Sequence, residues 1–224
     1  TIFAHGWWTI NGEKMSKSLG NVIDPNYLVD TYGVDQVRYF MLKEIPFGED
    51  GNFSEDLLVN RINSELSNDY GNLIQRVLSM LQKYKEGVVP ELESINELDK
   101  LLLNMPENIF KLVEKSMNNL QFNQALENIW QIIRKANAYV DTNKPWELSK
   151  EKNSSRLNTV LYILINTIYK TNILLQPFLP SSSKKIFKLL KQKEEIKFNE
   201  ISKNIETGLI FDSPQAIFPR HNKE

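Results

Sequence analysis

A stripe of apolar residues at helical spacing constrains this chain more than any other feature of its sequence. Its members recur every three or four positions and are Leu58, Ile62, Leu66, Tyr70, Leu73, Val77, Met80 and Tyr84. Ser54, followed by Glu55 and Asp56, supplies a helix N-cap and favourable charges in the first turn. The spacing therefore predicts one long amphipathic helix that begins at Ser54.

Helical patterns continue through most of the remaining chain. They cover residues 109–120 beyond Pro106, 122–139, 157–175 and 181–191. Trp130 is expected to lie in the core, and Pro177 and Pro180 separate the last two helices. Because 41% of the residues are hydrophobic, the chain can bury a sizeable core. The fold class is therefore mainly α, with an α-helical bundle over residues 53–224.

The first 52 residues follow a different pattern. Residues 2–4 and 7–10 are β-prone, and Asn11-Gly12 after them is a strong turn signal. Residues 26–43 indicate two short helices hinged at Gly33, after which Pro46, Gly48 and Gly51 are expected to break the chain. Residues 1–52 are therefore predicted to form a small α/β module.

Composition excludes several classes of protein and site. Lys and Arg number 27 against 28 Asp and Glu, so any RNA contact must come from local placement of charge. The chain has no cysteine and only two widely separated histidines, so no disulfide and no metal site is predicted. No apolar run reaches about 18 residues and no signal peptide is visible, which predicts a cytoplasmic protein without a membrane span.

The segment from Gly12 to Asn21 is a polar, cationic loop. Lys14 and Lys17 alternate with Ser16 and Ser18, and glycines bound the turn on both sides. A flexible amine can follow negative charge onto a pyrophosphate leaving group, and small neighbours let the backbone approach phosphates. From this chemistry alone, a triphosphate-binding loop and a solvated surface loop both stay open.

The five residues Lys14-Met15-Ser16-Lys17-Ser18 are identical to the second signature of class I aminoacyl-tRNA synthetases, and the loop resembles theirs. The resemblance implies that Lys14 and Lys17 stabilise the transition state in which an amino-acid carboxylate attacks the α-phosphate of ATP. Lys17 is the stronger candidate for phosphate contact. Met15, Ser16 and Ser18 would complete the ATP loop, with ATP and Mg²⁺ as substrate and cofactor of the intact enzyme.

Several members of that class share the signature, so the amino acid must be inferred from the surrounding sequence. The surroundings resemble the methionyl-tRNA synthetase family over nearly the whole chain. The segments that carry this resemblance are residues 5–8, 47–54, 60–73, 143–148, 174–180 and 217–220.

Asn72 and Arg76 lie four residues apart on the first long helix and therefore share a face. An amide and a guanidinium can read or stack on an unpaired base, although two solvated polar residues would show the same spacing. The methionyl family uses an Asn-x-x-x-Arg pair here for the anticodon. The resemblance therefore implies this role for Asn72 and Arg76.

Trp146 follows Pro145 at the predicted first turn of a short helix, where an indole can stack on a base or belong to the core. The family's Pro-Trp match implies the stacking role for Trp146. Together with the Asn-x-x-x-Arg pair, it would recognise the CAU anticodon of tRNA(Met).

The resemblance implies that residues 1–52 end a Rossmann-type catalytic domain and that residues 53–224 form an α-helical anticodon-binding domain. The intact enzyme would make methionyl-adenylate from methionine and ATP and then esterify tRNA(Met). The chain lacks an initiator methionine, so a carboxy-terminal fragment is expected, inactive alone because the other ATP signature lies upstream. Nothing resembling an added domain follows Arg220, which predicts a monomer.

Two alternatives stay open at this point. The chain could belong to a class I synthetase for another amino acid, in which case recognition of the CAU anticodon would fail. It could also be a stand-alone tRNA-binding helical module, which a preceding ATP signature in the natural sequence would argue against.

Overall fold

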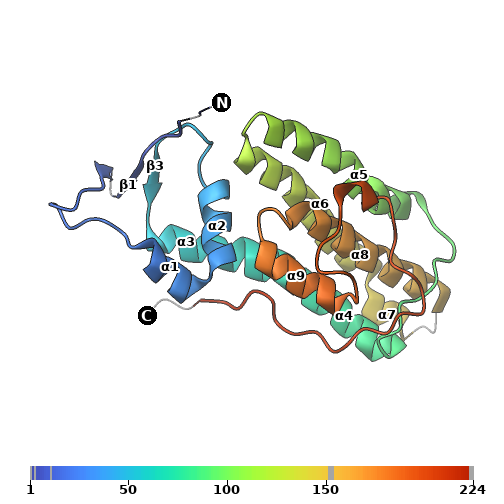
Figure 1. The fold of residues 1–224 in the computed structure, drawn as a ribbon. Helices are drawn as coiled ribbons and strands as arrows, with labels where there is room; N and C mark the ends of the chain where they lie inside the picture. Colours follow the sequence, from blue (N-terminus) through green and yellow to red (C-terminus); the bar gives the residue numbers. More distant parts are fainter. Residues whose placement is uncertain (1, 3, 11, 151–153, 222–224) are drawn as a thin grey trace.

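A small sheet lies at the amino-terminal end of the molecule, and a bundle of helices forms the rest (Figure 1). The computed structural model describes residues 2, 4–10, 12–150 and 154–221. The sheet has the strand order β2–β1–β3. Strand β1 (Trp8–Ile10) pairs antiparallel with β2 (Glu13–Lys14) and parallel with β3 (Gly51–Phe53). The mainly α fold class is confirmed, whereas the division at residues 52 and 53 stays a prediction.

The predicted first strand and its tight turn are confirmed only near the turn. Gly12 has φ +79°, in the region that glycine favours, and it lies between β1 and β2. Ile2 and Ala4 lie outside any strand, so the prediction of a strand there is wrong. The ladder with β3 begins at Trp8, and pairing rather than β-propensity decides where a strand starts. Phe3 and Asn11 lie outside the described residues.

Strand β3 occupies a segment that was expected to be a simple break. A Cβ atom on Gly51 would lie 1.2 Å from Cδ1 of Ile45, so no side chain fits at this position. The glycine therefore permits close packing within a strand rather than forming a turn. This reason cannot be seen in the local sequence.

The hinge between two short helices is confirmed. Helix α1 (Pro25–Tyr32) begins at Asp24, whose carboxylate accepts a hydrogen bond from the backbone N–H of Asn26. Helix α2 (Val34–Lys43) follows directly, and the glycine between the two helices has φ +96°.

The long helix predicted from Ser54 is continuous but changes its winding. Ser54 caps α3 (Glu55–Arg61) by accepting a hydrogen bond from the backbone N–H of Leu57 at 3.2 Å. The middle segment η1 (Ile62–Gly71) is a π-helix, and α4 (Asn72–Lys85) completes the rod. The predicted uniform α-helix is therefore wrong in its middle turns. Stripe residues from Leu58 to Tyr70 recur every four positions, which suits a helix with more residues per turn than an α-helix.

Helix α5 (Glu97–Asn118) begins well before the predicted residue 109 and passes through Pro106. The early start is explained by a capping box, in which Asn96 and Asp99 each bond the other's backbone N–H. Pro106 removes one helix hydrogen bond but is itself buried, so its ring contributes to packing. The expectation that the helix starts beyond Pro106 is wrong.

The other predicted helices are confirmed with shifted ends. They are α6 (Phe122–Asn143), α8 (Ser154–Leu175) and α9 (Pro180–Leu189), together with the short α7 (Pro145–Leu148). The 3₁₀ turn η2 (Phe198–Glu200) was not predicted. Helix α8 is buried on nearly all its faces and forms the centre of the bundle. Trp130 is fully buried on α6, as predicted.

Helix α2 fixes the sheet-bearing end of the chain to the bundle. The buried carboxylate of Asp35 accepts hydrogen bonds from the backbone N–H groups of Ser181 and Ser182, at the start of α9. Arg38 donates to the carbonyl oxygens of Pro177 and Phe178, just after α8 ends. Side chains of α2 therefore provide hydrogen-bond partners both for backbone N–H groups at the start of α9 and for carbonyl groups of the turn before it.

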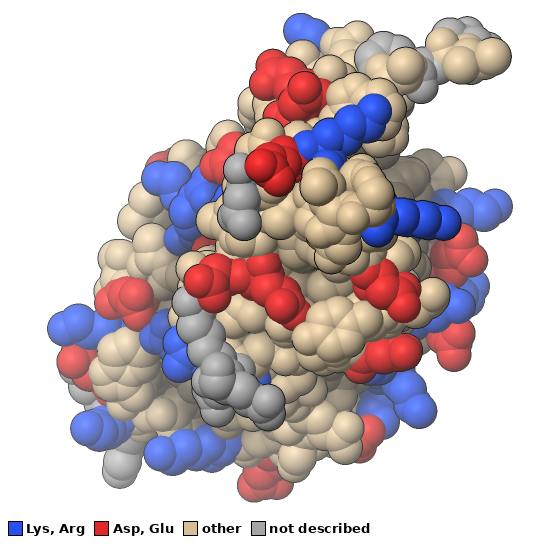
Figure 2. Space-filling model, turned by 90° about the vertical axis from the view of Figure 1, so that its left-hand side faces the viewer, with Lys and Arg blue, Asp and Glu red and all other residues tan. Residues whose placement is uncertain are grey.

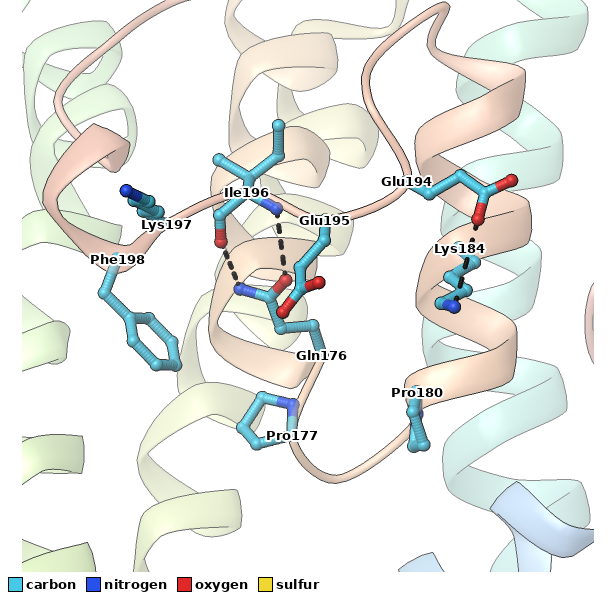
Figure 3. A pocket seen from close by; sticks show the side chains of 9 residues that line it. All are labelled: Gln176, Pro177, Pro180, Lys184, Glu194, Glu195, Ile196, Lys197 and Phe198. Atoms are coloured by element: carbon cyan, nitrogen blue, oxygen red, sulfur yellow. Dashed lines mark hydrogen bonds and ion pairs between the residues drawn. The ribbon is translucent and has the colours of Figure 1, made fainter.

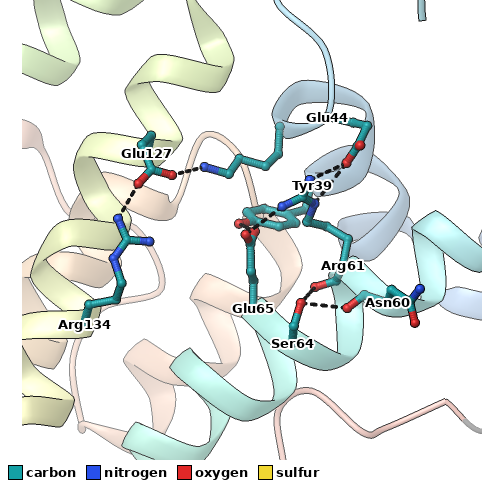
Figure 4. A network of polar contacts seen from close by, with 9 residues as sticks. Tyr39, Glu44, Asn60, Arg61, Ser64, Glu65, Glu127 and Arg134 are labelled. Atoms are coloured by element: carbon teal, nitrogen blue, oxygen red, sulfur yellow. Dashed lines mark hydrogen bonds and ion pairs between the residues drawn. The ribbon is translucent and has the colours of Figure 1, made fainter. Parts of the chain in front are cut away.

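A polar network reinforces this attachment (Figure 4). The ammonium of Lys43 on α2 lies 2.5 Å from the carboxylate of Glu127 on α6, which also pairs with Arg134. Arg61 on α3 bonds Glu44 at 2.6 Å and Glu65 at 2.8 Å. Acidic and basic groups alternate along the network, so each partly buried charge has an opposite neighbour.

None of the helices in the described part of the chain is long and apolar enough to cross a membrane.

Candidate functional site

The lysine loop is organised by its own polar groups. The amide of Asn21 accepts a hydrogen bond from the backbone N–H of Ser16 at 2.7 Å and donates to the carbonyl of Lys14 at 3.3 Å. The hydroxyls of Ser16 and Ser18 are 2.7 Å apart, and Gly20 has φ +67°. The side chain of Asn21 therefore links the two sides of the turn. This residue was not among the predicted site residues.

The two lysines occupy different positions on this loop. The Lys14 amine lies 3.8 Å from the ring centroid of Trp7, in a cation–π contact. Lys17 is exposed, and its backbone carbonyl accepts from the N–H of Gly20. Met15 is half-buried. The loop can thus present two ammonium groups and two hydroxyls to an anion.

Asn72 and Arg76 lie on one face of α4, in the helical bundle, whereas the lysine loop adjoins the small sheet (Figure 1). Asn72 is exposed, and its amide makes no hydrogen bond within the described chain. Arg76 is about one-third exposed, and its guanidinium bonds Asp141 at 2.8 Å. The acidic partner on the last turn of α6 was missed, because it is 65 residues away in sequence.

Trp146 is brought toward this face by the turn between α6 and α7. Lys144 adopts the left-handed conformation at φ +43° and ends α6, and Pro145 begins α7. The indole is half-buried against the bundle, so one part remains open to solvent. The carboxylate partner of Arg76 lies on the last turn of α6, just before α7, so Arg76 and Trp146 both lie near this end of α6.

A buried ion pair supports the end of α6. The carboxylate of Asp99, 0% exposed, accepts from Arg156 at 2.5 and 2.9 Å and from the Tyr139 hydroxyl at 2.6 Å. Burial acts to raise the pKa of Asp99, but these donors and the Asn96 backbone outweigh it and hold the pKa below its ordinary value. Arg156 also donates to Asn143 on the last turn of α6. The ion pair therefore fixes the turn that carries the indole.

A groove lies beside Asn72, between the η1–α4 rod and the carboxy-terminal tail. The residues that line it are Ser67, Asn68, Gly71, Asn72, Gln75, Ala216, Ile217, Phe218 and Arg220. Its rod side is rich in amides, and its tail side is mainly apolar. The tail was predicted only to resemble the family, and its position against the rod could not be read from the sequence.

A second hollow lies next to the turn between α8 and α9 (Figure 3). Gln176 crosses its floor by donating to the carbonyl of Ile196 at 2.7 Å and accepting from the same residue's N–H at 3.4 Å. At its rim, Lys184 lies 3.9 Å from Glu194. Opposite charges thus meet within this hollow, and it contains none of the predicted site residues.

On the face shown in Figure 2, acidic and basic side chains are interspersed, in keeping with a formal net charge of −1. Among the described residues, no group of three or more His, Asp or Glu side chains could hold a metal ion.

Two family comparisons match separate parts of the chain. Residues 1–78 match the family described as tRNA synthetases class I (M). Residues 99–217 match the family described as the anticodon-binding domain of tRNA ligase, which is just over half of the chain. Fold and sequence together define a class I tRNA synthetase with a helical anticodon-binding domain.

Curated relatives specify the family further. The chain is 45% identical to a methionine–tRNA ligase of Caldanaerobacter subterraneus subsp. tengcongensis, covering 100% of this chain and 35% of that protein. It is 43% identical to a methionine–tRNA ligase of Mycobacterium leprae, covering 98% and 42%. The chain thus belongs to the methionyl-tRNA synthetase family, whose carboxy-terminal region it resembles, and it spans less than half the length of these relatives.

Solved structures agree with this assignment. Mycobacterium tuberculosis methionyl-tRNA synthetase in complex with methionyl-adenylate superimposes with a TM-score of 0.93 at 39% identity, over 97% of this chain and 44% of that one. The apo form of the same enzyme gives a TM-score of 0.91 at 35% identity, over 99% and 44%.

Proposed function

We propose that this chain supplies the ATP loop and the anticodon reader of a methionine–tRNA ligase, which activates methionine with ATP and attaches it to tRNA(Met). The observation that carries the proposal is that two sites lie on different parts of one fold. The cationic loop adjoins the sheet, whereas Asn72, Arg76 and Trp146 belong to α4 and α7 of the bundle, and α2 is hydrogen-bonded to that bundle (Figure 1).

At the loop, Lys14 and Lys17 would bind the triphosphate of ATP and stabilise the charge that develops as the methionine carboxylate attacks the α-phosphate. Lys14 would leave the face of Trp7 to do so, a cost that phosphate contact offsets. The hydroxyls of Ser16 and Ser18 are within hydrogen-bond distance of each other and would face the same anion. Mg²⁺ would arrive on the phosphates, because it is usually held by few carboxylates and by substrate oxygens.

In the bundle, the CAU anticodon of tRNA(Met) would be read by side chains of α4 and α7. The free amide of Asn72 offers a donor and an acceptor to a base edge. The guanidinium of Arg76, oriented by Asp141, offers a planar surface and a fork of donors. The exposed part of Trp146 provides a stacking surface worth roughly 1–3 kcal/mol per base.

The intact protein would act as a cytoplasmic monomer, and residues 1–224 alone would be inactive in charging. The formal net charge of −1 supports binding through local contacts rather than through a broad basic field.

Paired measurements on the protein at its full natural length test this division of labour. Lys17→Ala should slow ATP–pyrophosphate exchange, because it removes an amine from the phosphates. Trp146→Ala should weaken binding of a CAU anticodon hairpin, and Trp146→Phe should restore part of it through its aromatic ring. Leu112→Ala, an exposed change on α5, should alter neither property. Equal binding of hairpins with and without CAU would refute the anticodon assignment.

A further inference from the structure

Trp7 is a large aromatic residue beside the lysine loop, and it is not part of the core. It is 61% exposed. The neighbouring Trp8 packs its ring against Phe40 and Phe53, with ring centroids 5.7 and 6.4 Å away. The indole of Trp7 instead has the ammonium of Lys14 over its face, 3.8 Å from the ring centroid. An exposed indole that contacts an amine rather than the core indicates a role in holding that amine.

The register of the sheet brings these two side chains together. Thr9 on β1 is paired with Lys14 on β2 in the antiparallel ladder. Trp7 lies two residues before Thr9, and side chains two residues apart on an extended chain project from the same face. Trp7 and Lys14 are therefore diagonal neighbours across the two strands, a separation that long and aromatic side chains can bridge. The contact thus follows from the pairing of β1 with β2.

The backbone around Trp7 is held by the segment that leads into β3. The N–H of Trp7 donates to Oδ1 of Asp50 at 2.6 Å, and its carbonyl accepts from the N–H of Gly51 at 2.8 Å. A Cβ atom on Gly6 would lie 2.2 Å from the carbonyl oxygen of Glu49, so the chain just before the indole packs directly on this segment. The indole is thus fixed at its backbone, whereas the lysine amine lies at the end of a flexible four-carbon stem.

We propose that Trp7 is a positioning residue of the ATP loop, whose indole holds the ammonium of Lys14 when no polyphosphate is bound and competes with polyphosphate for it. The proposal rests on the proposed function. The face of the ring is the negative side of an aromatic quadrupole, so it attracts an ammonium group and repels phosphate oxygens. The amine therefore turns away from the ring to contact a triphosphate or pyrophosphate. By taking the amine back, the indole favours release of the pyrophosphate that amino-acid activation produces.

The test is equilibrium binding to the protein at its full natural length, with Mg²⁺ present. The ligands are inorganic pyrophosphate and an ATP analogue with a methylene group between its α- and β-phosphorus atoms. Trp7→Leu removes the ring and keeps an apolar side chain, whereas Trp7→Phe keeps a smaller ring. Both are also combined with Lys14→Met, which removes the amine. Tyr84→Leu is the matched control, because it removes a cation–π contact with Lys83 on α4. Thermal unfolding verifies that each variant is folded, and Trp7→Phe decides the outcome where Trp7→Leu does not fold.

Trp7→Leu is expected to tighten binding of both ligands about two- to fivefold, as the loss of an exposed cation–π contact predicts, and Trp7→Phe to tighten it by less. Neither substitution should change binding in the Lys14→Met background, and Tyr84→Leu should change nothing. An equal effect of Trp7→Leu with and without Lys14→Met would show a structural role and overturn the inference.

Two further outcomes separate this inference from the proposed function. Unchanged or weakened binding for Trp7→Leu, with weakened binding for Lys14→Met and Lys17→Ala, would overturn the role of the indole alone. Unchanged binding for Lys14→Met and Lys17→Ala would overturn the proposed ATP loop as well.

Discussion

Replacing Asp99 with asparagine tests how the end of the bundle that carries Trp146 is held in place. The substitution keeps the shape of the side chain and one acceptor for the backbone N–H of Asn96. It removes the negative charge that faces Arg156, whose side chain is 21% exposed. The guanidinium then faces a neutral amide in place of a carboxylate, while its hydrogen bond to Asn143 stays.

The magnitude follows from the burial of the pair. Removing one partner of a buried ion pair costs about 3–5 kcal/mol, and the partial exposure of Arg156 reduces this to about 2–4 kcal/mol. For a chain of this size, each kcal/mol shifts the unfolding midpoint by about 2–4 °C, so Asp99→Asn should lower it by about 4–16 °C. Glu97→Gln is the matched control, because that exposed carboxylate pairs with Lys100 in the same turn and the change should alter stability by less than about 0.5 kcal/mol.

The pH dependence gives a second readout with a defined sign. The pKa of Asp99 is lower in the folded chain than in the unfolded chain, so its stabilisation is present above the unfolded value of about 3.9. It is lost as the pH falls through the folded pKa. The difference in unfolding free energy between wild type and Asp99→Asn should therefore be largest at neutral pH and shrink below about pH 4. A difference that is absent at pH 7, or unchanged at pH 3, would refute the ion-pair reasoning.

Three further substitutions have expected outcomes. Asp35→Ala should destabilise the chain by about 1–2 kcal/mol in urea unfolding, because the N-terminus of α9 loses its acceptor, whereas the exposed Asp30→Ala should not. Burial and the nearby Glu55 raise the pKa of Tyr32 to about 12, so Glu55→Gln should lower it toward 10 in an alkaline difference titration; an unchanged value would contradict this. Gly71→Ala should destabilise the chain by about 1–3 kcal/mol, because the added methyl group would press on the Leu66 carbonyl and on Phe218 of the carboxy-terminal tail. A fully stable variant would argue against this close contact.

Local signals in the sequence were enough to predict most helices. Ser54 caps its helix as expected, and Gly33 separates α1 from α2 with a backbone angle that other residues rarely adopt. The apolar stripe correctly gave the buried face of the long rod. It could not give the π-helical winding, because a four-residue spacing fits an imperfect α-helix as well. Pro106 was interpreted as a boundary, although burial and the preceding capping box make it an internal residue of α5.

The site was predictable only where it depends on residue type. The pair Asn72 and Arg76 could be placed on one face from their spacing, and Trp146 from the helix start at Pro145. The partner of Arg76 could not, because 65 residues separate it from Asp141. One wall of the groove beside Asn72 is the carboxy-terminal tail. This tail is held by contacts such as that between Asn63 and His221, which are 158 residues apart in sequence. Such contacts are determined by the tertiary fold and have no local signature.

The most direct test of the central claim is charging by the protein at its full natural length. Methionine attachment is measured with a tRNA(Met) transcript and with the same transcript carrying another anticodon, for the wild type and Trp146→Ala. We predict rapid charging of the CAU transcript only, reduced about 5- to 150-fold by the substitution, as the loss of one stacked base implies. Equal charging of both transcripts, or attachment of a different amino acid, would contradict the assignment of this chain as the anticodon reader of a methionine–tRNA ligase.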